Sequence, residues 1–148
     1  MIPREIAAGA IAGTAAAIGY IAAMKADLAL VDSNTDDLIL LGYPLVRDAD
    51  VARRVGALVH VANGAALGVA YSLVGRRYLP GPGWLRGAIF ANLENTLLYS
   101  LAKFEQHHPA IRDQVLDRYA TPTAFLQSIG RHVAYGVILG YVEDRLRA

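Results

Sequence analysis

The stretch His60-Val-Ala-Asn-Gly-Ala-Ala-Leu-Gly68 occurs a second time, with six of its nine residues identical, as His132-Val-Ala-Tyr-Gly-Val-Ile-Leu-Gly140. In each copy a histidine is followed by two glycines at intervals of four residues, which places all three on one face of an α-helix. The two copies lie 72 residues apart in a chain of 148 residues. Near the N-terminus, Gly9-Ala-Ile matches Gly87-Ala-Ile in the same way. We therefore predict one domain, residues 1–148, made of two copies of a helical unit (repeat 1: 1–77; repeat 2: 84–148).

The composition is more apolar than that of a typical soluble domain. Hydrophobic residues make up 55% of the chain, charged residues make up 18%, and the mean hydropathy is +0.33. Four apolar stretches, residues 6–24, 55–75, 85–102 and 121–142, approach or reach the length that crosses about 30 Å of hydrocarbon as a helix. We therefore predict an all-α integral membrane four-helix bundle, a tandem two-helix repeat with pseudo-twofold symmetry about the membrane normal.

The segments between these stretches predict an orientation. The two long connections carry many of the acidic residues. Arginine is instead dense in the short segments, at Arg4, Arg76, Arg77, Arg86, Arg145 and Arg147. Short loops rich in arginine stay on the cytoplasmic side. We expect a multipass protein of the bacterial inner (cytoplasmic) membrane with both termini cytoplasmic. We also expect a short interfacial helix or re-entrant turn at residues 36–44, a cap at Asp50 for the second long helix, and a cap at Thr121 for the fourth.

Several classes of function are excluded or disfavoured. The formal net charge of +1 gives no basis for binding nucleic acid. The chain has no cysteine, which excludes disulfides, thiolate chemistry and cysteine-ligated metal centres. It also contains no nucleophile elbow, HExxH motif or dinucleotide fingerprint. The sequence therefore favours a non-enzymatic role.

The duplicated glycines predict close helix packing. Gly64 and Gly68, and likewise Gly136 and Gly140, are four residues apart, the spacing at which two membrane helices approach backbone to backbone. We expect these faces to support a homo-oligomer or the assembly of a larger membrane complex. Membrane lipid is the other partner that this composition predicts.

A layer of polar residues is predicted inside the bundle. At a rise of about 1.5 Å per residue, polar groups on the second, third and fourth helices reach similar depths. Ionisable residues at such depths face the bundle interior. We expect the layer to be a ligand-binding site at the interface of the two repeats, with Glu94 and Arg131 forming an ion pair; its members are His60, Asn63, Glu94, Asn95, Arg131 and His132.

Three interpretations of this layer remain open. It can be a hydrogen-bonded network that fixes helix register, or a ligand or ion site. These two together describe a structural or ligand/ion-handling component of the membrane. The third interpretation is a cofactor: haem b held by His60 and His132 in an electron-transfer protein, or a divalent metal held by His60, His132 and Glu94 in a membrane enzyme.

The duplicated His-x-x-x-Gly-x-x-x-Gly motif, in a four-span chain of this size, resembles the small bacterial inner-membrane proteins of the YagU-like group. The residues that carry the resemblance are His60, Gly64 and Gly68, and then His132, Gly136 and Gly140. The resemblance implies the same location and architecture. It implies no reaction.

Overall fold

The chain is all-helical in the computed structural model, which describes residues 3–148, and no strand occurs within that range. The prediction of an all-α protein is confirmed. The α-helices are α1 (Arg4–Leu30), α2 (Asp37–Gly42), α3 (Ala49–Ala70), α4 (Arg76–Tyr78), α5 (Gly83–Tyr99), α6 (Pro109–Arg112) and α7 (Pro122–Arg147). A π-helix, η1 (Tyr71–Gly75), continues α3, and a 3₁₀ helix, η2 (Ser100–His107), continues α5.

Short polar side chains begin three of these helices. The Asp36 carboxylate accepts hydrogen bonds from the first turn of α2, where the sequence predicts a short helix, and Thr121 caps α7 as expected. The expected cap at Asp50 is wrong. The Asp48 side chain accepts from the backbone N–H of Val51 and begins α3, whereas Asp50 lies in the first helical turn. Asp48, two residues before the predicted cap, accepts from a backbone N–H group that has no partner within the helix.

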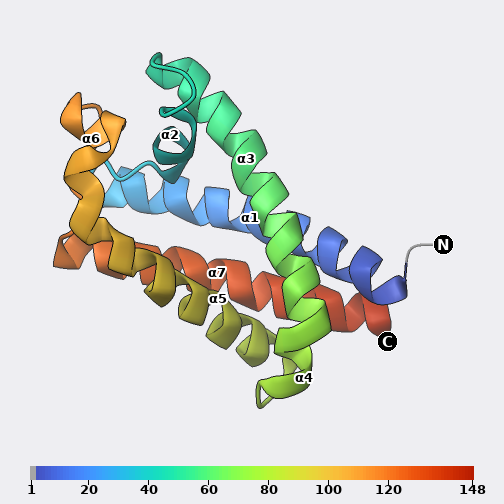
Figure 1. The fold of residues 1–148 in the computed structure, drawn as a ribbon. Coiled ribbons are helices and arrows are strands. Elements are labelled where there is room, and N and C mark those ends of the chain that lie inside the picture. Colours follow the sequence, from blue (N-terminus) through green and yellow to red (C-terminus); the bar gives the residue numbers. More distant parts are fainter. Residues whose placement is uncertain (1–2) are drawn as a thin grey trace.

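Two long helices form the centre of the molecule. α1 and α7 pack against each other, α3 packs on α1, and α5 packs on α7 (Figure 1). α2 folds back onto α3, and a small apolar cluster joins α2, α3 and the region of α6. The N- and C-terminal ends lie at the end of the molecule where α4 is found (Figure 1). The outer helices α3 and α5 therefore lie on the two flanks of a central pair.

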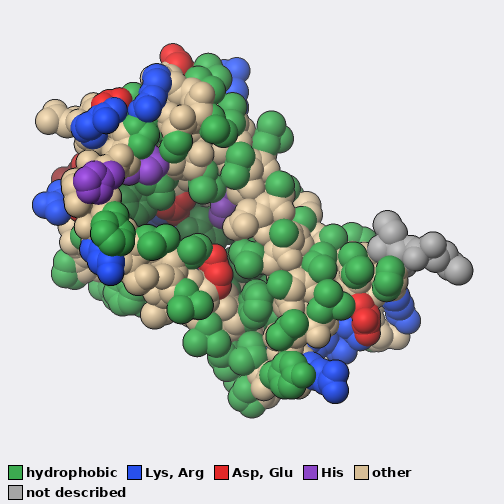
Figure 2. Space-filling model, in the orientation of Figure 1, with side chains coloured by type: hydrophobic (Ala, Val, Ile, Leu, Met, Phe, Trp, Pro, Cys, Tyr) green, Lys and Arg blue, Asp and Glu red, His purple; other side chains and the backbone are tan. Residues whose placement is uncertain are grey.

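The surface separates charge from apolar side chains. Lys and Arg gather at two ends of the face in Figure 2, and hydrophobic side chains spread over the band between them. Large apolar residues on α3, α5 and α7 are more than half exposed, among them Leu58, Leu97 and Leu126. Two helices are long and apolar enough to cross a membrane, α1 and the continuous helix Ala49–Tyr78.

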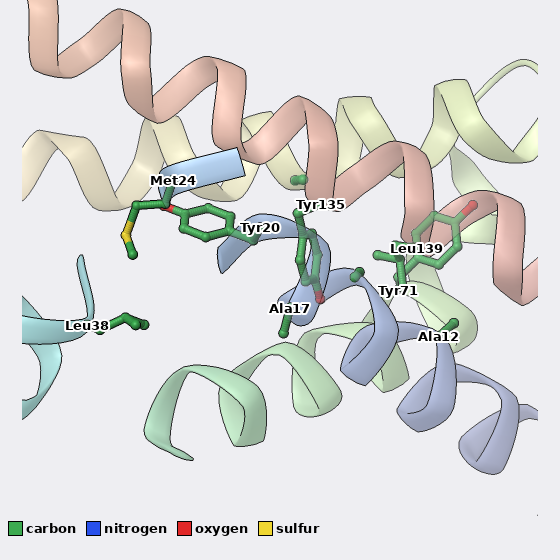
Figure 3. Packing of buried hydrophobic residues seen from close by; sticks show 10 residues of the cluster. Ala12, Ala17, Tyr20, Met24, Leu38, Tyr71, Tyr135 and Leu139 are labelled. Carbon is green, nitrogen blue, oxygen red and sulfur yellow. The ribbon is translucent and has the colours of Figure 1, made fainter. Parts of the chain in front are cut away.

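The centre of the molecule is packed with small and aromatic residues. Alanines of α1 lie beside Tyr20, Met24, Tyr71, Tyr135 and Leu139, most of which Figure 3 labels. Tyr71 and Leu139 have no exposed surface. Small residues on α1 leave room for these rings, so the core forms where the central helices approach closely.

Glycine makes the closest of these approaches possible. A Cβ added to Gly9 would lie 2.6 Å from the carbonyl oxygen of Gly68, and one added to Gly83 would lie 2.6 Å from that of Gly140. No side chain fits at such distances, because real Cβ contacts are longer. Gly64, Gly68, Gly136 and Gly140 all meet backbone or side-chain atoms of the same chain within 3 Å of the position of an added Cβ. The faces expected to support self-association are therefore covered within one molecule.

The contacts also show how the two helix pairs correspond. The sequence match pairs Gly9 with Gly87, but Gly83 is the residue that meets Gly140 as Gly9 meets Gly68. On α5 the equivalent contact therefore lies one helical turn earlier than the short sequence match predicts. The repeated Gly-Ala-Ile motif does not identify the glycine of α5 that makes this contact.

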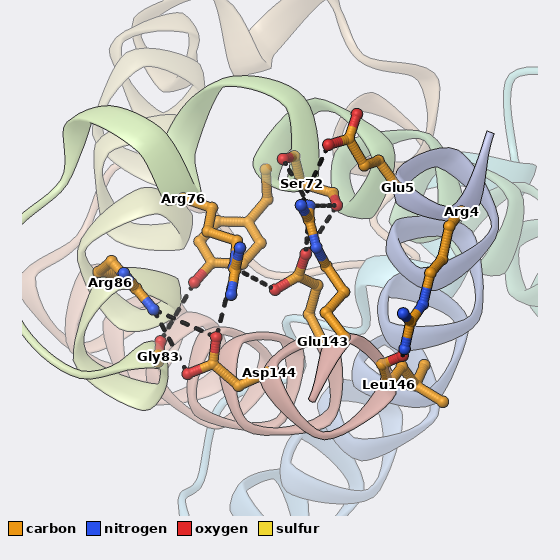
Figure 4. Close-up of polar contacts among 11 residues, drawn as sticks. Arg4, Glu5, Ser72, Arg76, Gly83, Arg86, Glu143, Asp144 and Leu146 are labelled. Carbon is orange, nitrogen blue, oxygen red and sulfur yellow. Dashed lines mark hydrogen bonds and ion pairs between the residues drawn. The ribbon is translucent and has the colours of Figure 1, made fainter.

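Ion pairs close the end of the molecule that holds the termini (Figure 4). Glu143 is fully buried and lies within 2.7 Å of the Ser72 hydroxyl, 2.9 Å of Arg76 and 3.2 Å of Arg147. Asp144 pairs with Arg86 at 3.2 Å. A buried carboxylate is tolerated only when it is paired and hydrogen-bonded, and this network supplies those partners.

Candidate functional site

An open cavity of about 590 Å³ lies between the two flanks of the molecule. α3 and α2 line one side, α5 and η2 line the other, and α1 and α7 contribute Tyr20, Ser128, His132 and Tyr135 at the base. Most of the lining is apolar or aromatic. Figure 2 shows this face hollowed, with histidine and acidic side chains in the hollow. A few polar groups in an apolar cleft of this size are typical of small-molecule sites.

The structure brings together five of the six residues of the predicted polar layer. His60 and Asn63 line the cavity from α3, Glu94 and Asn95 from α5, and His132 from α7. The prediction that these five residues lie at similar depths, made by counting residues from the helix ends, brought them together correctly. Arg131 is the exception, because it does not line this cavity.

Arg131 lies on another face of α7 in a cluster of its own. Its guanidinium is 2% exposed and lies 2.6 Å from Asp27 and 2.6 Å from Asp37, and it donates to the backbone carbonyl of Thr35 at 2.7 Å. The predicted Glu94–Arg131 ion pair is therefore wrong. Adjacent residues on an α-helix point about 100° apart, so Arg131 and His132 cannot both face α5.

His132 and Glu94 form the polar centre of the cavity. The Nδ1 atom of His132 lies 2.8 Å from the backbone carbonyl of Ser128, and its Nε2 atom lies 3.4 Å from a carboxylate oxygen of Glu94. A carbonyl only accepts hydrogen bonds, so Nδ1 carries a proton. The Nε2 edge of the His132 ring therefore faces Glu94.

Tyr20 joins this pair to the second histidine and to the arginine cluster. Its ring centroid lies 4.6 Å from that of His60 and 5.1 Å from that of His132. Its hydroxyl donates to Asp37 at 2.7 Å, and Asp37 is also a partner of Arg131. The Nε2 atom of His60 is buried and has no hydrogen-bond partner.

Sequence reasoning missed Tyr20 and Asp37. Tyr20 is the only aromatic residue in the first apolar stretch, residues 6–24, and that isolation is a signal that could have been used. Asp37 lies in a long connection, where helical periodicity gives no information about which side chains turn inward.

The other carboxylates of the lining are compensated. Asp37 is paired with Arg131, and Glu105 accepts from Arg118 at 2.7 Å and from the backbone N–H of Ala120 at 2.9 Å. Burial would raise the pKa of Glu105, but the N–H of Ala120, the Arg118 side chain and the N–H of Tyr119 together hold that pKa below its ordinary value. Among the described residues, the cavity lining contains no Lys or Arg.

These contacts do not fit the cofactor alternatives. Two histidines that hold a haem iron each need a free nitrogen on opposite sides of the porphyrin. Both ring nitrogens of His132 already face protein groups, and the Tyr20 ring contacts both imidazoles. Within residues 3–148, no group of three or more His, Asp or Glu is arranged to hold a metal ion. The set His60, His132 and Glu94 therefore has no support as a metal site.

Comparison with known proteins identifies one family. The family described as "Family of unknown function (DUF6789)" matches residues 3–148, and the chain belongs to it. No curated protein and no solved structure matches the chain. The comparisons do not test the resemblance to YagU-like proteins, which stays a prediction. Function therefore has to be inferred from the site itself.

Proposed function

We propose that this member of the DUF6789 family is a multipass membrane protein that binds a small amphipathic molecule in the cavity between α3 and α5. The cavity is the observation that carries the proposal. Its volume of about 590 Å³ and its apolar walls suit a ligand that is mostly hydrocarbon. Its lining offers a polar end to that ligand at His60, Glu94 and His132. No group in the site is arranged as an activated nucleophile, and the proposed role is binding rather than reaction.

The proposed location is the bacterial inner membrane, with four spans and both termini in the cytoplasm. α1 and the helix Ala49–Tyr78 have the length and hydropathy of spans. α5 and α7 carry more charge, but Arg86 pairs with Asp144 at one end and Arg131 is turned into the molecule. Leu93, Leu97 and Leu126 of these helices are exposed. In a bilayer these leucines would meet lipid. A cavity that opens between two such helices takes its ligand from the hydrocarbon.

Assembly with other subunits remains a proposal. The glycine faces are covered within the chain. A homo-oligomer or a larger complex would therefore form through the exposed apolar faces of the outer helices.

The proposal is tested by blocking the cavity. Leu98→Trp and Asn63→Trp each place a large ring in the lining, from α5 and from α3 respectively. We expect purified protein to enhance the fluorescence of the neutral apolar probe N-phenyl-1-naphthylamine saturably, above a detergent blank. Both variants should lose most of that saturable signal. Leu126→Trp is the matched control, because Leu126 is exposed on α7 outside the cavity. Saturable binding that survives both blocking variants would contradict the proposal.

A further inference from the structure

We propose that the ligand of this cavity is a lipophilic cation, and that it binds at the Glu94 carboxylate. This inference rests on the proposed ligand cavity and names the chemistry of its occupant. It follows from the charges, the aromatic lining and the unpartnered polar atoms of the site.

The charges of the lining select the sign of the ligand. Three carboxylates line the cavity. Asp37 and Glu105 are each held by a nearby arginine, at 2.6 and 2.7 Å. Glu94 has only an imidazole, at 3.4 Å, and its side chain is 20% exposed toward the open space. An anion would find no Lys or Arg among the described lining residues, whereas a cation finds one carboxylate without a permanent counter-ion.

The loose contact between Glu94 and His132 leaves this carboxylate available. Its contact with His132 is a single approach to Nε2 at 3.4 Å, whereas Nδ1 of His132 lies 2.8 Å from the Ser128 carbonyl. A cation that binds against the carboxylate pairs a charge that no Lys or Arg of the described lining holds.

The rest of the lining suits a cation with an apolar body. Tyr20, Phe90, Tyr99 and Tyr135 are aromatic residues of the lining. Aromatic faces attract cations through the ring quadrupole, more strongly when water is excluded. His60 adds a buried Nε2 atom that has no partner, which would accept a hydrogen bond from an ammonium N–H.

The test compares two ions of the same shape and opposite charge. Tetraphenylphosphonium and tetraphenylborate are titrated into the detergent-purified full chain by calorimetry, with the Leu98→Trp and Asn63→Trp proteins as blanks. We expect tetraphenylphosphonium to bind about tenfold more tightly than tetraphenylborate, because only the cation is attracted to the Glu94 carboxylate. Glu94→Gln should remove that preference. Glu94→Asp, which keeps the charge, should restore most of it. Glu5→Gln, the same change at an exposed position remote from the cavity, should leave it intact.

The outcomes separate the two proposals. Equal affinity for the two ions, or a preference that Glu94→Gln leaves unchanged, would overturn the cation inference. If binding of both ions is also lost in the blocking variants, the proposed ligand cavity is supported and only the proposed charge of its ligand is wrong. If neither ion's binding responds to the blocking variants, the proposed function fails and this inference fails with it.

Discussion

At the scale of single residues, the site depends on two buried clusters that share Asp37. Tyr20 donates to this carboxylate from the cavity side, and Arg131 approaches it from α7. Removing one member of a buried charged cluster leaves the others without partners, which destabilises more than the intact cluster stabilises. We therefore expect Arg131 to have a structural role.

Replacing Arg131 with leucine tests that role. The change leaves Asp27 and Asp37 without their arginine, so the free energy of unfolding should fall by about 3–5 kcal/mol. Arg112→Leu is the control, because that side chain is 64% exposed and pairs only with its neighbour Asp113. Thermal unfolding in detergent, followed by circular dichroism, measures both. A loss for Arg131→Leu no larger than that for Arg112→Leu would show that the cluster does not hold α1, α2 and α7 together.

Glu105 gives a prediction of pH dependence. Its pKa lies below the ordinary value, because hydrogen bonds from Ala120, Arg118 and Tyr119 outweigh the effect of burial. A depressed pKa in the folded state means that the carboxylate stabilises the fold above its unfolded pKa, about 4.3, and that this contribution is lost as the pH falls through the folded pKa. Glu105→Gln should therefore be less stable than the wild type at pH 7, and the difference should shrink below about pH 4.

Chemical unfolding of both proteins at a series of pH values from neutral to acidic measures that difference. A gap that stays constant as the pH falls would mean that the charge of Glu105 does not hold the segment before α7.

At the scale of elements, two helix pairs are built on glycine contacts, α1 with α3 and α5 with α7. Gly68→Ala puts a Cβ within 3 Å of the Gly13 backbone and should destabilise by about 1–3 kcal/mol through overpacking. A Cβ at Gly130 meets no atom within 4 Å, so Gly130→Ala should be neutral or stabilising by up to about 1 kcal/mol. The unfolding midpoint of Gly68→Ala should fall, whereas that of Gly130→Ala should stay the same or rise. Equal effects would mean that the α1–α3 contact is not tight.

Helical periodicity and length were enough to predict the long helices. The four apolar stretches all became helices, and the caps at Asp36 and Thr121 follow from local chemistry. The π-helix η1 was not predicted, because one extra residue in a turn leaves the apolar pattern nearly unchanged. Its first two residues make contacts across the molecule, since Tyr71 donates to the carbonyl of Gly83 and Ser72 donates to Glu143.

Most of the site was predictable for the same reason, and part of it was not. Depth along a helix follows from the number of residues, so His60, Glu94 and His132 were correctly brought together. Direction around the helix axis depends on packing, so Arg131 was assigned to the wrong partner. Contacts between a helix and a long connection, such as Tyr20 with Asp37, have no periodic signal in sequence.

At the scale of the whole molecule, charge gathers at two ends and a hollow, mostly apolar face lies between them (Figure 2). One end holds the termini and α4, and the other holds α6 (Figure 1). In the proposed arrangement the first end faces the cytoplasm and the second end faces the opposite side. The band between them then lies in hydrocarbon, and the cavity opens into lipid.

The most direct test uses the absence of native cysteine, which makes single-cysteine variants free of background labelling. Tyr78→Cys reports on the end with the termini, and Arg112→Cys reports on the other end; both native side chains are exposed. In intact bacterial cells, a membrane-impermeant maleimide should label Arg112→Cys at once and Tyr78→Cys only after the inner membrane is permeabilised. Labelling of both variants in intact cells, or recovery of the protein without detergent in the soluble fraction, would contradict the membrane-spanning arrangement.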